Sequence, residues 1–166
     1  KQKTAYEIRN CDWSSDVCSS DLTIGYKILL REVVRLKLGW DDPLPKELAD
    51  KFKKKFRELV MAEDVVFPRS IKPVGTSGPP EILGFWDGGD PAFGACIYAR
   101  HKLDKPGPAG ETHTVRLLAG KARVTPLKRN TTPRSELSGL LTLTRLLNSL
   151  WRGFPDLPKR VSLDRK

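Results

Sequence analysis

The sequence predicts an α/β domain in which three antiparallel strands, one helix and a fourth strand follow a small helical segment. Three runs with apolar residues at alternating positions are separated by short turns, at 81–87, 93–100 and 114–124. A helical pattern at 132–151 follows them, and a last apolar run begins at 160. Because a meander of strands is followed by a crossover helix, the fourth strand should make the sheet mixed.

Two amphipathic helices are expected before the sheet. Residues 24–38 alternate apolar and charged side chains with helical spacing, and Gly39 ends the pattern. Residues 45–61 repeat this spacing around a basic run, KFKKKFR at 51–57, whose simplest interpretation is a solvated helix face. Residues 64–67 indicate a short strand. Together these elements predict a helical connecting segment over residues 23–71.

The elements of the sheet are expected after a linker at 72–80, which is rich in Pro, Gly and Ser. Thr132 and Pro133 are a suitable cap and first residue for the helix, and Gly153 ends it. The chain stops soon after the fourth strand begins. We therefore expect residues 81–166 to form an incomplete domain.

Composition points to a polyanionic partner. The chain has 30 Lys and Arg against 20 Asp and Glu, a net charge of +10, which favours nucleic acid over an ordinary basic surface. No apolar stretch matches a membrane span or a signal peptide, so no membrane partner and a cytoplasmic location are expected. The 3 cysteines lack the paired spacings of a disulfide framework or a zinc site.

Residues 1–22 do not blend into the pattern that follows. The run CDWSSDVCSSDL at 11–22 resembles the translation of a sequencing-library adapter, and residues 1–8 resemble the outer part of the same oligonucleotide. We interpret this segment as an artefact of the gene sequence and exclude it from the fold. A metal-binding or redox tail is the alternative, but Cys11 and Cys18 have no histidine nearby.

Two carboxylates stand out because the patterns place them on core faces. Asp87 ends the first strand, and a period of two puts it on the face of Leu83 and Phe85. Glu136 shares a helix stripe with Leu140, Leu143, Leu147 and Leu150. Taken singly, Asp87 could be a turn aspartate, and Glu136 a glutamate favoured by the helix dipole. Converging in a basic chain, they indicate a divalent metal and a phosphate substrate.

These residues resemble the first two acidic motifs of ribonuclease H. The resemblance rests on FWDG at 85–88, FGACIY at 93–98 and TTPRSEL at 131–137. In their detailed sequence these motifs are similar to the ribonuclease H region of BEL/Pao-type LTR retrotransposon Pol polyproteins. The segments LKLGWDDPLP at 36–45, FPR at 67–69 and LLAGKARVTPL at 117–127 match the same family, the first in its connecting segment. The resemblance covers about residues 24–163 and implies an incomplete ribonuclease H-like fold.

The family implies a hydrolase that cuts the RNA strand of an RNA–DNA hybrid with paired Mg²⁺ ions, for which Mn²⁺ can substitute. By resemblance, Asp87 bridges both ions and Glu136 holds one. The implied partners are the hybrid and the reverse transcriptase of the same polyprotein, within a virus-like particle if the element is active. Basic residues near the start of the helix are candidates for phosphate contacts, with ordinary surface charge as the alternative: Arg123, Lys128, Arg129 and Arg134.

The third acidic position departs from the family. In the family, the third aspartate lies two or more residues beyond the last apolar position of the fourth strand. In this chain Leu163 is that last apolar position, and Asp164 follows it directly. Lys166 occupies the position where the family has its aspartate. Asp164 is therefore a displaced candidate for the third catalytic residue, and we expect impaired hydrolysis. A non-catalytic nucleic-acid-binding or tethering module and a non-functional product of a degenerate element remain as alternatives. An aspartic protease and an integrase-type nuclease fit the motifs less well.

Overall fold

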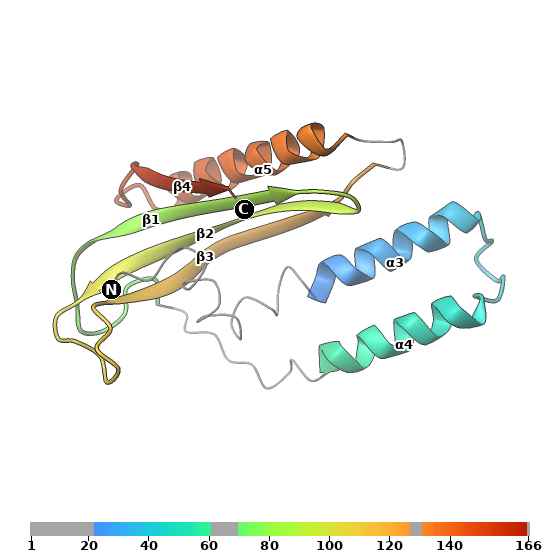
Figure 1. Ribbon diagram of the computed structural model, residues 1–166, viewed down its shortest axis with the longest axis horizontal. Coiled ribbons are helices and arrows are strands. Elements are labelled where there is room, and N and C mark those ends of the chain that lie inside the picture. The colour runs from blue at the N-terminus through green and yellow to red at the C-terminus, as the bar shows by residue number, and fades with distance from the viewer. Residues whose placement is uncertain (1–21, 61–69, 127–130, 166) are drawn as a thin grey trace.

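The computed structural model describes residues 22–60, 70–126 and 131–165, which form three helices and one sheet (Figure 1). The elements are α3 (Leu22–Leu36), α4 (Lys46–Val60), β1 (Thr76–Gly88), β2 (Ala92–Leu103), β3 (His113–Val124), α5 (Thr132–Gly153) and β4 (Val161–Arg165). The strand order is β3-β2-β1-β4, with β2 antiparallel to both of its neighbours and β4 parallel to β1. The predicted mixed α/β architecture is confirmed.

Strand β1 begins earlier than the sequence pattern indicates. Its first residue is Thr76, so the second half of the segment expected to be a linker is strand. Between Ser77 and Glu81 the register to β2 shifts, and Gly78 has a positive φ of 71°. Such a bulge accommodates the two prolines that follow Gly78, because residues in a bulge do not all have to donate a backbone N–H to the neighbouring strand and proline has none to donate. The strand expected at 64–67 lies outside the described residues.

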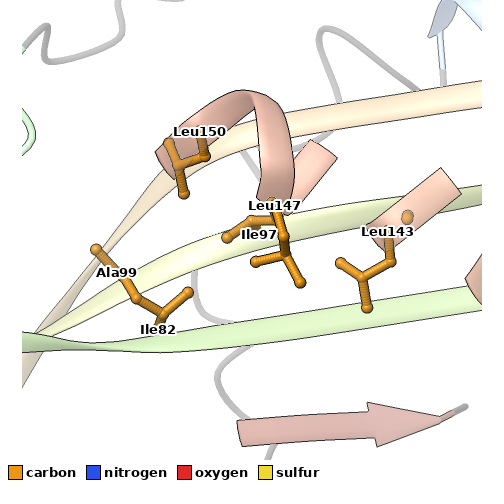
Figure 2. Packing of buried hydrophobic residues seen from close by; sticks show 7 residues of the cluster. Ile82, Ile97, Ala99, Leu143, Leu147 and Leu150 are labelled. Atoms are coloured by element: carbon orange, nitrogen blue, oxygen red, sulfur yellow. The ribbon is translucent and has the colours of Figure 1, made fainter. Parts of the chain in front are cut away.

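The main core lies between α5 and the sheet. Figure 2 shows leucines of α5 directed at small and branched side chains of β1 and β2. The buried members of this cluster are Ile82, Ala95, Ile97, Ala99, Leu143, Leu147 and Leu150. Leucines at helical spacing meet strand residues at a spacing of two, which is how an amphipathic helix covers one face of a sheet.

The opposite face of the sheet carries a second, smaller cluster. Leu83 and Tyr98 are its buried members, and the rings of Phe85 and Tyr98 meet edge to face with centroids 5.8 Å apart. On the α5 side, a Cβ at Gly84 would lie 3.1 Å from Leu143 Cδ2. The predicted alternation along β1 is thus confirmed, with Ile82 and Gly84 facing α5 and Leu83 and Phe85 facing away.

Glu81 joins three neighbouring strands. Its carboxylate pairs with the Arg100 guanidinium on β2, and it accepts a hydrogen bond of 2.8 Å from Ser162 Oγ on β4. Burial by itself would raise the pKa of Glu81, but the hydrogen bond from Ser162 and the positive charge of Arg100 outweigh burial and hold this pKa below its ordinary value. The short strand β4 is therefore tied to β1 by a charge-assisted contact as well as by its ladder.

Replacing Glu81 with Gln should destabilise the fold by about 0.5 kcal/mol at neutral pH, because the contact is partly solvent-exposed. Since the folded pKa of Glu81 lies below the free value of 4.5, its ionised form stabilises the fold fully above pH 4.5, and this contribution is lost as the pH falls through the folded pKa. The measurement is the melting temperature of both proteins from pH 7 to 3.

The two melting curves should converge at the acid end of this range. Asp156→Asn is the matched control, because Asp156 is exposed and its charge should matter little. A constant difference between wild type and Glu81→Gln at every pH would show that the ion pair does not stabilise the fold.

Helices α3 and α4 form a hairpin near the end of the sheet where β1 ends and β2 begins (Figure 1). Leu29 and Leu48 are buried, and the rings of Tyr26 and Phe52 lie 6.5 Å apart between the two helices. Lys27 Nζ donates to the carbonyl of Ala122 on β3 at 3.3 Å, so α3 contacts the sheet directly. None of the described helices combines the length and apolar character needed to cross a membrane.

Candidate metal centre

The segments that carry Asp87 and Glu136 meet at Gly88. A Cβ placed on Gly88 would lie 2.3 Å from both the carbonyl carbon and oxygen of Ser135 and 2.5 Å from the backbone nitrogen of Glu136. Real Cβ atoms do not approach other atoms this closely, so only glycine allows this contact. The residue after Asp87 therefore touches the peptide that precedes Glu136, so the two chain segments are in backbone contact. The role of Asp87 and Glu136 as metal ligands stays a prediction.

A second glycine completes the close approach. A Cβ on Gly139 would lie 2.7 Å from the carbonyl oxygen of Asp87. The buried side of α5 consequently begins with small residues, and its buried members are Ser135, Gly139, Thr142, Leu143, Leu147 and Leu150. The predicted stripe of Glu136 and Leu140 is wrong at this end, since both are only half-buried. The helix lies so near β1 there that no large side chain fits between them.

Asp87 is exposed, which corrects its interpretation as a core-facing carboxylate. By the confirmed alternation of β1, it follows Leu83 and Phe85 on the face away from α5, but it stands at the end of the strand, beyond their cluster. Its Oδ1 accepts a hydrogen bond of 2.9 Å from the backbone nitrogen of Gly88. A carboxylate in this position can take a cation from solvent without first being freed from a core.

Glu136 is half-buried at the border of the helix–sheet contact. Helix α5 starts at Thr132 with Thr131 as its N-cap, and its first turn contains no acidic residue. The helix dipole acts mainly within that first turn, so it does not account for a glutamate at position 136. The simpler alternative that the sequence left open for Glu136 is thereby weakened.

The third candidate, Asp164, can be placed by its backbone alone. In the parallel ladder its Cα pairs with Phe85, and that of Arg165 pairs with Trp86. Asp164 therefore stands two residues short of Asp87 along the strand direction, about 6.6 Å at the usual rise. The register thus sets Asp164 opposite Phe85 and not opposite Asp87, and its role as a displaced third catalytic residue stays a prediction. Lys166 lies outside the described residues.

The predicted nucleic-acid-binding residues are only partly described. Arg123 on β3 and Arg134 in the first turn of α5 are both exposed. A positive charge at a helix N-terminus opposes the dipole, so Arg134 does not stabilise α5 electrostatically. Lys128 and Arg129 lie outside the described residues, in the connection between β3 and α5. Phosphate binding by these four residues stays a prediction.

Carboxylate oxygens are donors that suit Mg²⁺ better than a softer metal, and a metal at this site stays a prediction. Among the described side chains, no group of three or more His, Cys, Asp or Glu gathers around one point. Mg²⁺ is typically held by one or two carboxylates, with water and substrate phosphate as its remaining ligands. Asp87 and Glu136 supply carboxylates from two segments in backbone contact, so the residues present suit a hard cation that keeps most of its water.

Sequence reasoning missed two residues that bond to the turn after Asp87, Arg31 and Thr125. Arg31 reaches from α3 to the turn after Asp87, and Thr125 is buried directly after β3. Nothing in the helical pattern distinguishes Arg31 from Arg35. The close approach at Gly139 did carry a signal, because an isolated glycine in a helix often marks backbone contact.

The strand order β3-β2-β1-β4 with a crossover helix between β3 and β4 is that of a ribonuclease H-like fold. The chain belongs to the family of Pao retrotransposon-like RNaseH-like domains, whose family model matches residues 15–157. This confirms the resemblance inferred from the motifs. No curated protein and no solved structure matches the chain significantly. The match includes residues 15–22, and the adapter origin of residues 1–22 stays a prediction.

Proposed function

We propose that this chain is a metal-dependent nuclease domain of a Pao-type retrotransposon polyprotein and hydrolyses the RNA strand of RNA–DNA hybrids. The observation that supports this most strongly is the contact of Gly88 with the Ser135–Glu136 peptide. Through that contact, two segments almost fifty positions apart, each with an acidic residue, meet at one end of the sheet, which supports a shared cation site.

Asp87 and Glu136 would hold the cation, Mg²⁺ or Mn²⁺. When bound, such an ion activates a water molecule and stabilises the leaving oxygen of the phosphodiester. The exposure of Asp87 lets the cation and a scissile phosphate arrive together from solvent. The contact at Gly88 limits how far the two carboxylates can separate, because neither segment can move without displacing the other.

Nucleic acid is the partner that the charge favours. The net charge of +10 supplies the general attraction for phosphates, and RNA is distinguished from DNA by its 2′-hydroxyl groups. Arg123 and Arg134 are exposed on the two elements that flank the β3–α5 connection, where they could contact the backbone of a hybrid. The reverse transcriptase of the same polyprotein would be the neighbour that produces this substrate.

The register of Asp164 opposite Phe85 favours a slow enzyme. A third carboxylate two residues too early binds a second ion poorly, and two-ion chemistry depends on both ions. The same observation supports a second candidate function, a module that binds hybrids without cutting them.

The test is an assay of the full chain on three duplexes of one sequence: an RNA–DNA hybrid, an RNA duplex and a DNA duplex. We expect slow cleavage of the RNA strand in the hybrid alone, in Mg²⁺ or Mn²⁺, and complete inhibition by EDTA. Salt-dependent hybrid binding without cleavage in either metal would instead identify the non-catalytic module. A chain that neither binds nor cleaves the hybrid would contradict both functions.

A further inference from the structure

Arg31 of α3 makes several contacts at the end of the sheet. Its Nη1 donates to the Thr125 carbonyl oxygen and to Thr125 Oγ1, both at 3.0 Å, and to the Pro91 carbonyl oxygen at 3.3 Å. Its Nη2 lies 3.9 Å from Asp90 Oδ1, and the Arg31 side chain is only 17% exposed. A planar guanidinium with several fixed donors suits such a site, whereas a lysine offers a single point charge.

Thr125 and Pro91 connect the same segments from the other side. The buried Thr125 donates from its backbone nitrogen to the Pro91 carbonyl oxygen at 2.9 Å and from its Oγ1 to the same oxygen at 2.8 Å. The Pro91 carbonyl is therefore a common acceptor for α3 and for the residue that follows β3. Three segments far apart in the sequence are joined at this one atom.

Two of these segments belong to connections next to β1 and α5, the elements that carry the candidate metal ligands. The turn at Asp90 and Pro91 follows the end of β1, which carries Asp87, and it is closed by Gly89 donating to the Ala92 carbonyl at 3.0 Å. Thr125 begins the connection from β3 to α5, which carries Glu136. The guanidinium of Arg31 thus bonds to both connections at once.

We propose that Arg31 is a positioning residue for the metal centre. It acts through the backbone: by fixing the β1–β2 turn against the residue that follows β3, it restrains the end of β1 where Asp87 lies. The contact of Gly88 with the Ser135–Glu136 peptide keeps that end of β1 against α5. Helix α3 is then part of the catalytic domain and not only a tether to the rest of the polyprotein. This inference rests on the proposed function, because it assumes that the two carboxylates bind a cation.

The experiment measures Mn²⁺ affinity of the full chain by electron paramagnetic resonance, which detects free Mn²⁺ without any need for turnover. Arg31→Gln removes the forked donor, Arg31→Lys keeps the charge, and Arg35→Gln removes an exposed charge from the same helix as a matched control. We expect Arg31→Gln to weaken Mn²⁺ binding roughly tenfold, as the loss of a partner that orients a metal ligand does. Arg31→Lys should recover only part of this, and Arg35→Gln should bind like wild type.

A second readout is independent of metal. Hydrogen exchange at the Gly89 amide, which bonds to the Ala92 carbonyl, should be faster in Arg31→Gln than in Arg35→Gln, because the turn opens more often. Thr125→Val keeps the Arg31 side chain and removes the hydroxyl that donates to the Pro91 carbonyl and accepts from Arg31 Nη1. Thr125→Val should weaken Mn²⁺ binding and speed exchange of the Gly89 amide, as Arg31→Gln does. If Arg31→Gln does not fold, Thr125→Val tests the positioning role in its place.

The variant Asp87→Asn separates the proposed positioning role of Arg31 from the proposed metal centre. If Asp87→Asn weakens Mn²⁺ binding while the folded Arg31 and Thr125 variants bind Mn²⁺ like wild type, the positioning role is contradicted and the proposed function stands. If Asp87→Asn leaves Mn²⁺ binding unchanged, the metal centre itself is contradicted. Weaker binding in Asp87→Asn and in the Arg31 or Thr125 variants, together with unchanged binding in Arg35→Gln, supports both.

Discussion

Asp87→Asn is expected to eliminate hybrid cleavage and to weaken Mn²⁺ binding at least about 100-fold, more than the loss of a residue that only orients a ligand. Asparagine keeps the size of the side chain and an oxygen that can accept the 2.9 Å hydrogen bond from Gly88. The variant therefore removes the negative charge with little change in local structure. Cleavage of a labelled hybrid and Mn²⁺ titration measure the two effects.

Hybrid binding provides an internal control for this variant. Removing a negative charge beside the substrate phosphates should leave hybrid affinity unchanged or slightly higher, because the attraction comes from basic residues elsewhere. Asp104→Asn changes an exposed aspartate in the connection after β2 and should affect neither cleavage nor metal binding. Cleavage by Asp87→Asn at the rate of Asp104→Asn would overturn the proposed role of Asp87.

Gly88→Ala is expected to have the largest effect on stability. The new methyl group would lie 2.3 Å from backbone atoms of Ser135, and a helix backbone cannot turn aside as a flexible side chain can. Overpacking of this kind costs about 3 kcal/mol, or roughly 6–12 °C in melting temperature for a chain of this size. Thermal unfolding followed by circular dichroism measures the loss.

Gly120→Ala on β3 is the matched control, because a Cβ there would meet no atom within 4 Å. It should be neutral or stabilising by about 0.5 kcal/mol, as strand glycines generally are when replaced by alanine. Gly88→Ala should also weaken Mn²⁺ binding, since relieving the clash moves α5 away from β1. Equal melting temperatures for the two variants would contradict the close contact on which the proposed metal centre depends.

Much of the fold follows from local patterns. The runs at 81–87, 93–100 and 114–124 alternate clearly enough to predict three strands, and each was found within a longer strand. The start of β1 was missed because Pro79 and Pro80 resemble a linker, and only pairing with β2 across a bulge makes those residues part of a strand. Pairing of that kind joins distant residues, so composition in the segment itself does not reveal it.

For the candidate site too, the sequence predicted one part and the structure corrected another. The types and spacing of Asp87 and Glu136 were sufficient to select them, but periodicity placed both on core faces, and the structure finds one exposed and the other half-buried. For Glu136 the difference arises because α5 approaches β1 through Gly88 and Gly139, which leaves room only for small residues on the buried side of the helix. Asp87 is exposed because it lies at the end of its strand, beyond the cluster of Leu83 and Tyr98.

The sequence patterns were enough to establish an α/β domain and the order of its strands and helix, and to predict a pair of acidic residues as cation ligands. Alternation and helical spacing are short-range properties, and each can be read within a dozen residues. The contact of β1 with α5, the register that sets Asp164 opposite Phe85 and the bonds of Arg31 to two connections became visible in the folded chain alone. Each of these depends on how segments separated by tens of residues pack, and packing is a property of the assembled core.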